Sequence, residues 1–271
     1  MGVGAVSEAR AAPAGAREAP AGGEAILSAR GLVMEFRGFR AVNGVDLDVR
    51  EGTIHALIGP NGAGKTTVFN LLTKFLTPTE GAIRFRGRDI TRLKPAEVAR
   101  LGLVRSFQIS AVFPHLSVLD NVRVALQRPA GLATQFWRSN GALHRLDARA
   151  GELIEAVGLS PYAHLDAAEL PYGRKRALEI ATTLALDPPV MLFDEPMAGM
   201  GAEDIGRVSA LIRRIARGRT VLMVEHNLGV VADLCDRVTV LARGEILAEG
   251  DYATVSADPR VREAYMGSEH D

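Results

Sequence analysis

The feature that most constrains this chain is a glycine-rich segment at residues 59–67, which fits the pattern G-x-x-x-x-G-K-[ST]. It follows an apolar run at residues 53–58, which has the composition of a strand buried on both faces. A helical pattern then extends from Lys65 to about residue 75. This order of strand, turn and helix predicts a loop that surrounds phosphate groups. The predicted loop comprises Gly59, Pro60, Asn61, Gly62, Ala63, Gly64, Lys65, Thr66 and Thr67.

The residue types of this loop suit the binding of a nucleoside triphosphate. Glycines allow successive backbone N–H groups to point inward around phosphates, and the start of the following helix adds partial positive charge. We expect Lys65 to reach the β- and γ-phosphates of ATP and the Thr66 hydroxyl to be a ligand of Mg²⁺. A glycine-rich turn with an incidental lysine is the alternative, and the rarity of the full pattern at average composition disfavours it.

Two carboxylates follow a second apolar strand pattern, at residues 190–193. Asp194 comes directly after that run, and we expect it to hold the Mg²⁺ shell. Glu195 is next, where a carboxylate could polarise a water molecule for in-line attack on the γ-phosphate. An isolated Asp-Glu pair usually lies in a solvated loop, but the apolar strand and the phosphate loop upstream favour the catalytic interpretation.

Strand and helix patterns alternate along most of the chain, which is typical of an α/β protein with a mostly parallel sheet. The predicted strands lie at residues 26–36, 42–49, 53–58, 81–90, 103–107, 190–193, 220–224, 238–241 and 246–248. The predicted helices lie at residues 65–75, 116–126, 145–157, 173–186, 202–216 and 228–234, with two more at the C-terminal end. Few strand signals occur between about residues 109 and 187, which predicts a helical subdomain inserted into the α/β core.

Composition excludes several classes of protein. The 271 residues carry 32 Lys and Arg against 32 Asp and Glu, so no basic surface for nucleic acid is expected. The single cysteine, Cys235, allows no intramolecular disulfide and fits a reducing, cytosolic setting. No apolar run approaches the roughly 18 residues of a membrane helix, so we expect a soluble chain. Residues 1–25 are rich in Ala, Gly and Pro and are predicted to be a disordered tail.

With Asp194, Glu195 and Pro196 in place, the chain resembles the nucleotide-binding subunits of ABC transporters from about residue 26 to residue 267. The resemblance implies a P-loop NTPase core with an antiparallel β subdomain and an inserted α-helical subdomain, together spanning residues 26–268. Further residue roles follow from the same resemblance. Phe36 would stack on adenine, with Phe39 as the competing candidate, Gln108 would sense Mg²⁺ and the γ-phosphate, and His226 would contact the γ-phosphate.

Two motifs depart from the common family form. The signature reads Leu-Pro-Tyr-Gly-Arg at residues 170–174 instead of Leu-Ser-Gly-Gly-Gln, so Pro171 stands where a serine hydroxyl would bind the γ-phosphate of the partner's ATP. Tyr172 and Gly173 open the following helix, and backbone N–H groups at a helix start still bind phosphate. Residues 198–201 read Ala-Gly-Met-Gly where Ser-Ala-Leu-Asp is usual, which would weaken communication between the two sites of a dimer.

These departures are similar to those of the branched-chain amino acid uptake subfamily, the LivG type, and so are residues 112–118 and 258–267. The resemblance implies an ATPase that uses Mg-ATP and pairs with a second ABC ATPase subunit of the same or a different kind. It would drive transmembrane permease subunits, to which a solute-binding protein delivers the solute. It would lie on the inner face of the cell membrane through the permease. Phe113 and Leu116 belong either to the surface that contacts the permease or to the core of the helical subdomain.

Several alternatives stay open at this point. Within the family, the substrate could be urea or an amide, an aromatic acid, or lipopolysaccharide for export. A non-transport ABC ATPase would be expected to carry two cassettes or a long coiled coil, and the sequence has neither pattern. A regulatory module without turnover is disfavoured because Lys65, Asp194, Glu195 and His226 are all present.

Overall fold

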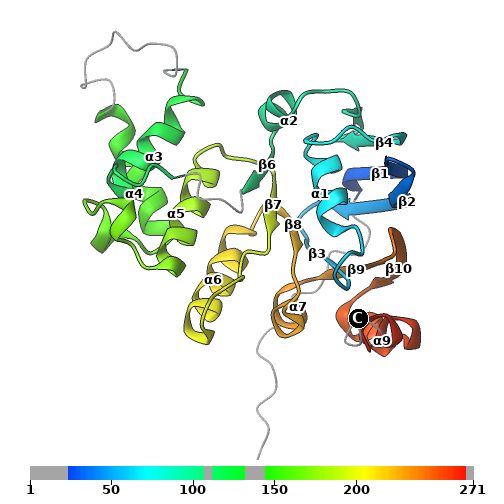
Figure 1. The fold of residues 1–271 in the computed structure, drawn as a ribbon. Coiled ribbons are helices and arrows are strands. Elements are labelled where there is room, and N and C mark those ends of the chain that lie inside the picture. The colour runs from blue at the N-terminus through cyan, green and yellow to red at the C-terminus, as the bar shows by residue number, and fades with distance from the viewer. Residues whose placement is uncertain (1–23, 107–111, 132–143, 267–271) are drawn as a thin grey trace, which may run out of the picture.

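The computed structural model describes residues 24–106, 112–131 and 144–266, which form two β-sheets surrounded by helices (Figure 1). The predicted tail lies almost entirely outside the described residues. The first strand begins at Ala25, because Ala25 pairs with Arg50 of the next strand. The α/β class expected from the sequence is confirmed.

The larger sheet has six strands in the order β10-β9-β3-β8-β7-β6. Its members are β3 (Ile54–Ile58), β6 (Leu103–Ser106), β7 (Val190–Asp194), β8 (Thr220–Val224), β9 (Arg237–Ala242) and β10 (Glu245–Gly250). Neighbouring strands from β9 to β6 run parallel, and β10 joins β9 as an antiparallel edge. Every residue of β3, β7 and β8 is buried, as expected for strands covered on both faces.

The smaller sheet is antiparallel and has the order β2-β1-β4-β5. It is built from β1 (Ala25–Phe36), β2 (Phe39–Arg50), β4 (Glu80–Phe85) and β5 (Arg88–Asp89). Its apolar side chains share one buried cluster with α1 (Lys65–Leu72) and with β3 through Leu57. The first helix is thus held between the two sheets, and this fixes the direction in which it leaves the glycine-rich loop.

The other helices cover the larger sheet and extend to one side of it (Figure 1). A group formed by α3, α4 and α5 lies beside the edge strand β6, with α6 next to it. Their bounds are α2 (Pro95–Leu101), α3 (Val118–Gln127), α4 (Asp147–Ala156), α5 (Tyr172–Leu184), α6 (Ala202–Ile215), α7 (Leu228–Leu234), α8 (Tyr252–Ala257) and α9 (Pro259–Met266). Short 3-10 turns, η2 (His144–Leu146), η3 (Ser160–Tyr162) and η4 (Ala167–Glu169), connect the helical group.

The structure corrects several predicted boundaries for local physical reasons. Helix α1 ends at Leu72 and not near residue 75, because the Thr73 hydroxyl donates to the Phe69 carbonyl at 2.7 Å and Lys74 turns to a positive φ of 64°. The strand pair expected at residues 81–90 is present as β4 and β5, which are joined by a turn at Arg86 and Gly87, both with positive φ. Helix α2 was not predicted, since its seven residues are too short for a clear apolar period.

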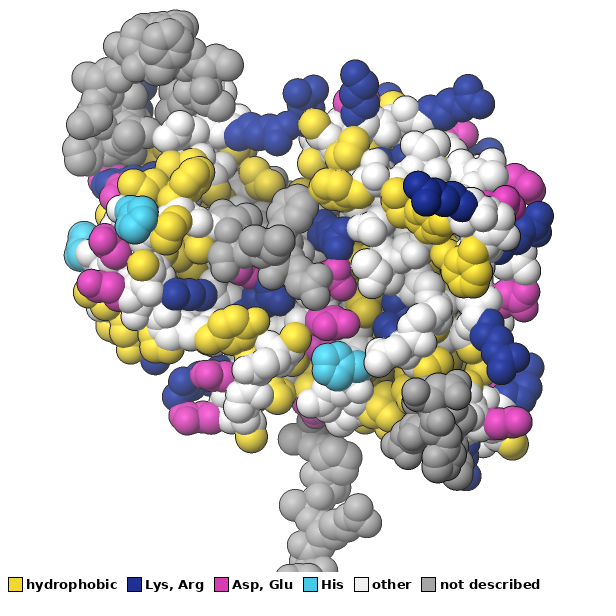
Figure 2. Space-filling view, in the orientation of Figure 1, with side chains coloured by type: hydrophobic (Ala, Val, Ile, Leu, Met, Phe, Trp, Pro, Cys, Tyr) yellow, Lys and Arg dark blue, Asp and Glu magenta, His cyan; other side chains and the backbone are white. Residues whose placement is uncertain are grey.

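Acidic and basic side chains are interspersed over the face of the molecule seen in Figure 2, as the balanced composition suggests. In the described part of the chain, no helix is both long and apolar enough to cross a lipid bilayer.

Candidate nucleotide-binding and catalytic site

The candidate site lies at the carboxyl ends of the inner strands of the larger sheet. Strands β3, β8 and β7 are parallel neighbours, so their carboxyl ends lie side by side. The glycine-rich loop follows β3, Glu225 and His226 follow β8, and Glu195 follows β7. Open α/β sheets bind their ligands at these strand ends. Tertiary structure therefore gathers residues that are up to 167 positions apart in sequence, from Gly59 to His226.

The glycine-rich loop has a backbone that only glycine can follow at two positions. Gly59 has φ 149°, and a Cβ built on it would lie 2.1 Å from the carbonyl oxygen of Leu241. At Gly64, with φ 100°, a Cβ would lie 2.6 Å from the carbonyl oxygen of Ala41. Strands β9 and β2 thus press against the loop from two directions, which holds its N–H groups in a fixed arrangement. A phosphate cradle of the kind predicted from the sequence would need such a closely packed glycine backbone.

Lys65 begins α1 and folds back over the loop. Its ammonium group donates to the carbonyl oxygens of Gly59 at 2.6 Å and Pro60 at 2.8 Å. Burial lowers the pKa of Lys65 below its ordinary value, and the Glu195 carboxylate opposes that shift. The same lysine is therefore within electrostatic reach of the loop and of the carboxylate beyond β7. Thr66, the next residue, is exposed at the start of the helix.

Asp194 and Glu195 differ in exposure although they are adjacent. Asp194 is buried at the end of β7, and its carboxylate pairs with the guanidinium of Arg105 on β6. Glu195 turns out of the strand with φ 46°, a left-handed conformation that is uncommon for a residue other than glycine. Its side chain is 32% exposed, and Oε2 lies 4.0 Å from Nδ1 of His226. The turn thus buries one carboxylate and presents the other at the sheet edge.

His226 has an exposed side chain, but a buried neighbour holds its backbone. The Glu225 carboxylate is fully buried and accepts the backbone amides of His226 at 3.0 Å and Asn227 at 3.2 Å through Oε2. Its other oxygen accepts the amide of Met197, from the loop beyond Glu195, at 3.1 Å. Sequence reasoning missed Glu225. The signal for it was an acidic residue directly after the all-apolar strand β8.

The signature segment lies at the start of α5, away from the glycine-rich loop of the same chain (Figure 1). Pro171 occupies the N-cap position and offers no side-chain cap. Tyr172 is 56% exposed, whereas Gly173 is buried against Asp204, whose Cγ would lie 2.6 Å from a Cβ at that position. The helix start therefore exposes the side chain of Tyr172, while its backbone at Gly173 packs closely against Asp204 of α6.

The two candidate adenine-stacking residues lie at the tip of the β1–β2 hairpin. Phe36 ends β1 and Phe39 begins β2, and the two are register partners. Both side chains are exposed, at 41% for Phe36 and 68% for Phe39. The geometry therefore offers either ring to a base and does not separate the two candidates. Gln108, predicted to sense Mg²⁺ and the γ-phosphate, lies outside the described residues.

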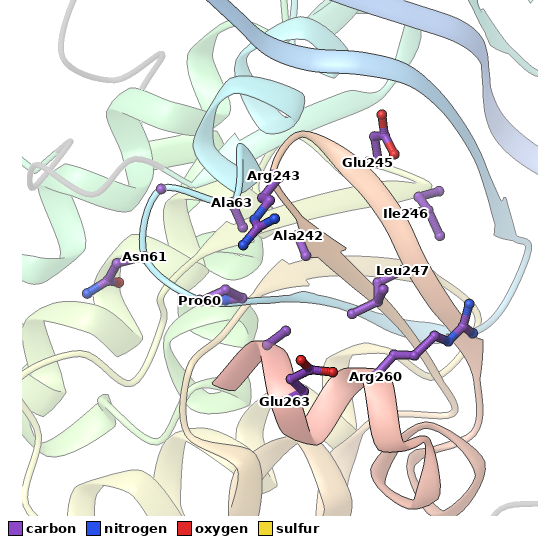
Figure 3. A pocket seen from close by; sticks show the side chains of 12 residues that line it. Pro60, Asn61, Ala63, Ala242, Arg243, Glu245, Ile246, Leu247, Arg260 and Glu263 are labelled. Atoms are coloured by element: carbon purple, nitrogen blue, oxygen red, sulfur yellow. The ribbon is translucent and has the colours of Figure 1, made fainter. Parts of the chain in front are cut away.

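A pocket of about 640 Å³ lies beside the glycine-rich loop and is bordered by α9 and the β9–β10 turn (Figure 3). Arg260 and Glu263 project into it from α9, and Arg243 from the turn. Tyr265, also on α9, is beside this lining. Burial raises the pKa of Tyr265 to about 12, and a hydrogen bond with the Gly59 backbone partly opposes that rise. The C-terminal helix is thus in contact with the first glycine of the loop.

The donor set at the site fits a metal ion that is held mainly by phosphates. Asp194 contributes a buried carboxylate, and Thr66 a hydroxyl at the start of α1. Within the described ranges there is no group of three or more His, Cys, Asp or Glu side chains that could hold a metal ion by themselves. Mg²⁺ commonly takes one or two protein oxygens and completes its shell with substrate phosphates and water.

Comparison with known proteins agrees with this geometry. A family model described as ABC transporter matches residues 42–198, which is more than half of the chain. The structure superposes on the ADP conformation of MJ1267, an ATP-binding cassette of an ABC transporter, with a TM-score of 0.78 and 30% sequence identity, covering 90% of this chain and 99% of that one. The chain belongs to the ABC transporter family, as one of its ATP-binding ATPases.

Its position within that family is also defined. Residues 245–271 match a second family model, described as branched-chain amino acid ATP-binding cassette transporter. The chain is 38% identical over 250 residues to the high-affinity branched-chain amino acid transport ATP-binding protein LivG of Salmonella typhimurium, covering 89% of this chain and 98% of the relative. It is 39% identical over 251 residues to the corresponding protein BraF of Pseudomonas aeruginosa, with the same coverage. The family resemblance read from the motifs is confirmed.

Proposed function

We propose that this ATPase powers a membrane importer for branched-chain amino acids or closely related small solutes. The similarity to LivG and BraF over nearly their whole length supports this substrate class, together with the match of residues 245–271 to the branched-chain model. In this proposal, the chain works on the inner face of the cell membrane, bound to transmembrane permease subunits. A solute-binding protein delivers the solute to that permease. Residues 26–268 act as one cassette, with the helical subdomain at about residues 109–187.

The observation that carries the catalytic proposal is the meeting of the glycine-rich loop, Glu195 and His226 at the carboxyl ends of three parallel strands. The loop amides and Lys65 bind the phosphates of ATP, and Phe36 or Phe39 stacks on adenine. Glu195 accepts a proton from the attacking water, since its carboxylate is partly exposed and its Oε2 lies 4.0 Å from Nδ1 of His226. His226 and Gln108 orient the γ-phosphate.

Mg²⁺ bound by Asp194, Thr66 and Gln108 would neutralise charge on the β- and γ-phosphates. Asp194 is ready for that role because the Arg105 guanidinium holds its carboxylate at the end of β7. Most of the catalytic effect then comes from positioning and charge stabilisation, which a fixed loop and a fixed strand end can supply.

Each site needs a second subunit, because α5, which begins at Tyr172, lies away from α1, which begins at Lys65 (Figure 1). We infer that the partner ATPase, identical or different, brings its own signature segment onto the bound ATP. ATP binding then closes the dimer, and loss of the γ-phosphate lets it reopen. The permease converts this closure into transport.

A Glu195→Gln variant tests the catalytic assignment. The amide cannot accept the proton, so phosphate release should fall about 10²–10⁴-fold while ATP binding is kept. ATP should also shift the variant to a dimer in size-exclusion chromatography. Phosphate release at the normal rate would remove Glu195 from its proposed role.

The substrate assignment needs the assembled transporter. Affinity-tagged chain would be purified with its co-expressed permease and solute-binding protein, reconstituted in vesicles, and supplied with ATP and labelled leucine, urea or benzoate. Stimulated uptake of leucine alone supports the proposal. Uptake of urea or benzoate in its place would assign the chain to a different transport system.

A further inference from the structure

Arg176 on α5 reaches from the signature helix to the turn that carries Glu195. Its guanidinium donates to three successive backbone carbonyl oxygens: Asp194 at 3.4 Å, Glu195 at 3.2 Å and Pro196 at 3.3 Å. The side chain is only 6% exposed. A cation with several planar donors is well suited to hold a group of carbonyls that point the same way.

The turn needs such a partner because its backbone is strained. Glu195 adopts φ 46°, which side-chain-bearing residues rarely do. Conformations of this kind persist only where the surroundings determine them. On one side the Glu195 amide donates to the Val224 carbonyl at 3.0 Å, and on the other the Arg176 guanidinium donates to the carbonyl oxygens of the turn. The direction of the Glu195 side chain is thus set from both sides of the turn.

Glu179, one helical turn along α5, fixes the guanidinium itself. Its carboxylate oxygen lies 2.5 Å from Nη1 of Arg176, and its side chain is only 7% exposed. A buried ion pair of this kind adds little net stability, because both charges lose their hydration. It does orient the planar guanidinium and neutralise its charge. A role in positioning explains the pair better than a role in stability.

We propose that Arg176 is a positioning residue which holds Glu195 in its catalytic orientation and couples it to the signature helix of the same chain. The inference rests on the proposed function, in which Glu195 activates water and Tyr172 and Gly173 face the partner's ATP. Arg176 lies four residues beyond Tyr172, about one turn of α5. A displacement of the helix start by the partner's nucleotide therefore reaches Glu195 of this chain through one rigid side chain.

The primary test is an Arg176→Gln variant of the full chain. Steady-state phosphate release should show kcat lowered about tenfold or more, since small misplacements of a catalytic group are costly. The Kd of a fluorescent ATP analogue should change less than about twofold, because the glycine-rich loop is untouched. A rise in Kd with an unchanged kcat would overturn the proposal. Arg176→Lys should recover only part of kcat, because a single ammonium group cannot reach three carbonyls.

A double-mutant cycle separates positioning from general damage. If Arg176 acts through Glu195, adding Arg176→Gln to Glu195→Gln should leave the residual turnover within about twofold of the single Glu195→Gln variant. Equal losses in both backgrounds would overturn the proposal. Normal turnover of Glu195→Gln alone would instead contradict the proposed function, so the two failures are distinguishable.

The chain contains a matched control. Arg149 and Glu152 on α4 form an ion pair with the same i, i+3 spacing, but both side chains are at least half exposed. Arg149→Gln should leave kcat and Kd unchanged. Should Arg176→Gln fail to fold, as shown by circular dichroism, Glu179→Gln serves in its place: it keeps the guanidinium but replaces the carboxylate that orients it with a neutral amide. That variant should lower kcat with Kd unchanged, and wild-type kcat in it would contradict the proposal.

Discussion

The buried carboxylate of Glu225 accepts the backbone amide of Met197 at 3.1 Å, which joins the loop after β8 to the loop after β7. The second carboxylate oxygen accepts hydrogen bonds from the backbone amides of His226 and Asn227. Two loops that carry proposed catalytic side chains, Glu195 and His226, thus share one acceptor. A carboxylate can serve three N–H donors in this way because it offers only acceptor positions.

Replacement of this carboxylate should affect both stability and turnover. In Glu225→Gln one oxygen becomes an NH₂ group that faces N–H donors, which leaves buried groups unpaired at a cost of about 1–3 kcal/mol. We expect the free energy of unfolding, measured by urea denaturation, to fall by that order and kcat for ATP to fall about tenfold or more. Glu152→Gln, at an exposed position on α4, is the control and should change neither quantity. Wild-type values for Glu225→Gln would show that the shared acceptor is dispensable.

Loss of the Lys65 ammonium group should weaken nucleotide binding. The group lies over the glycine-rich loop on the Gly59 and Pro60 carbonyls, where it would meet the phosphates. For Lys65→Ala we expect the Kd of a fluorescent ATP analogue to rise by at least about tenfold, which corresponds to about 1.4 kcal/mol. The fold should persist, since the side chain is only partly buried. The exposed Lys94→Ala provides the comparison, and equal affinity in both variants would contradict the assignment.

The contact between Gly59 and β9 should make this position intolerant of any side chain. In Gly59→Ala the Cβ would collide with the Leu241 carbonyl oxygen, a backbone atom that cannot move independently. Overpacking of this kind costs about 1–3 kcal/mol or more, so the melting temperature should drop by several degrees. Gly62→Ala has a positive φ of 75° but open space, and should lose only about 1–2 kcal/mol. The order of the two melting temperatures is the result that checks the prediction.

Stability should depend on pH through His55, which is fully buried on β3. Burial, together with the charges of Arg237 and Arg50, lowers the pKa of His55 from 6.5 to about 3. The unfolded chain therefore takes up a proton as the pH falls below 6.5, while the folded chain stays neutral down to about pH 3. The stabilising contribution is complete above pH 6.5 and is lost as the pH falls, with a slope of at most about 1.4 kcal/mol per pH unit.

His55→Gln removes this titration while keeping a polar group near the Thr239 hydroxyl, which lies 2.8 Å from Nε2 of His55. Urea denaturation between pH 7 and pH 4 should show a shallower decline in the free energy of unfolding for the variant than for the wild type. The exposed His164→Gln should keep the wild-type slope. Parallel curves for His55→Gln and the wild type would mean that other groups account for the pH dependence.

The sequence by itself determined the parts of this protein whose physics is local. The glycine-rich loop, the all-apolar strands β3, β7 and β8, and the placement of Asp194 and Glu195 at a strand end all follow from residue type and short-range order. Helix ends were less predictable, since the end of α1 depends on the hydroxyl of Thr73 and the positive φ of Lys74. The family motifs then supplied roles for His226 and for the signature segment.

Only the tertiary structure decided which groups support the site. Arg176 and Glu195 are 19 residues apart, and Glu225 and Met197 are 28 apart, so neither contact follows from spacing along the chain. A buried Arg looks in sequence like any solvent-exposed charge, and the position of Glu225 directly after β8 marks the residue without revealing its partners. Their partners are backbone carbonyl and amide groups, which every residue carries and no side-chain pattern reveals. Packing of α5 and β8 against the turn after β7 gives these charges their positions, and the sequence specifies that packing only through the fold as a whole.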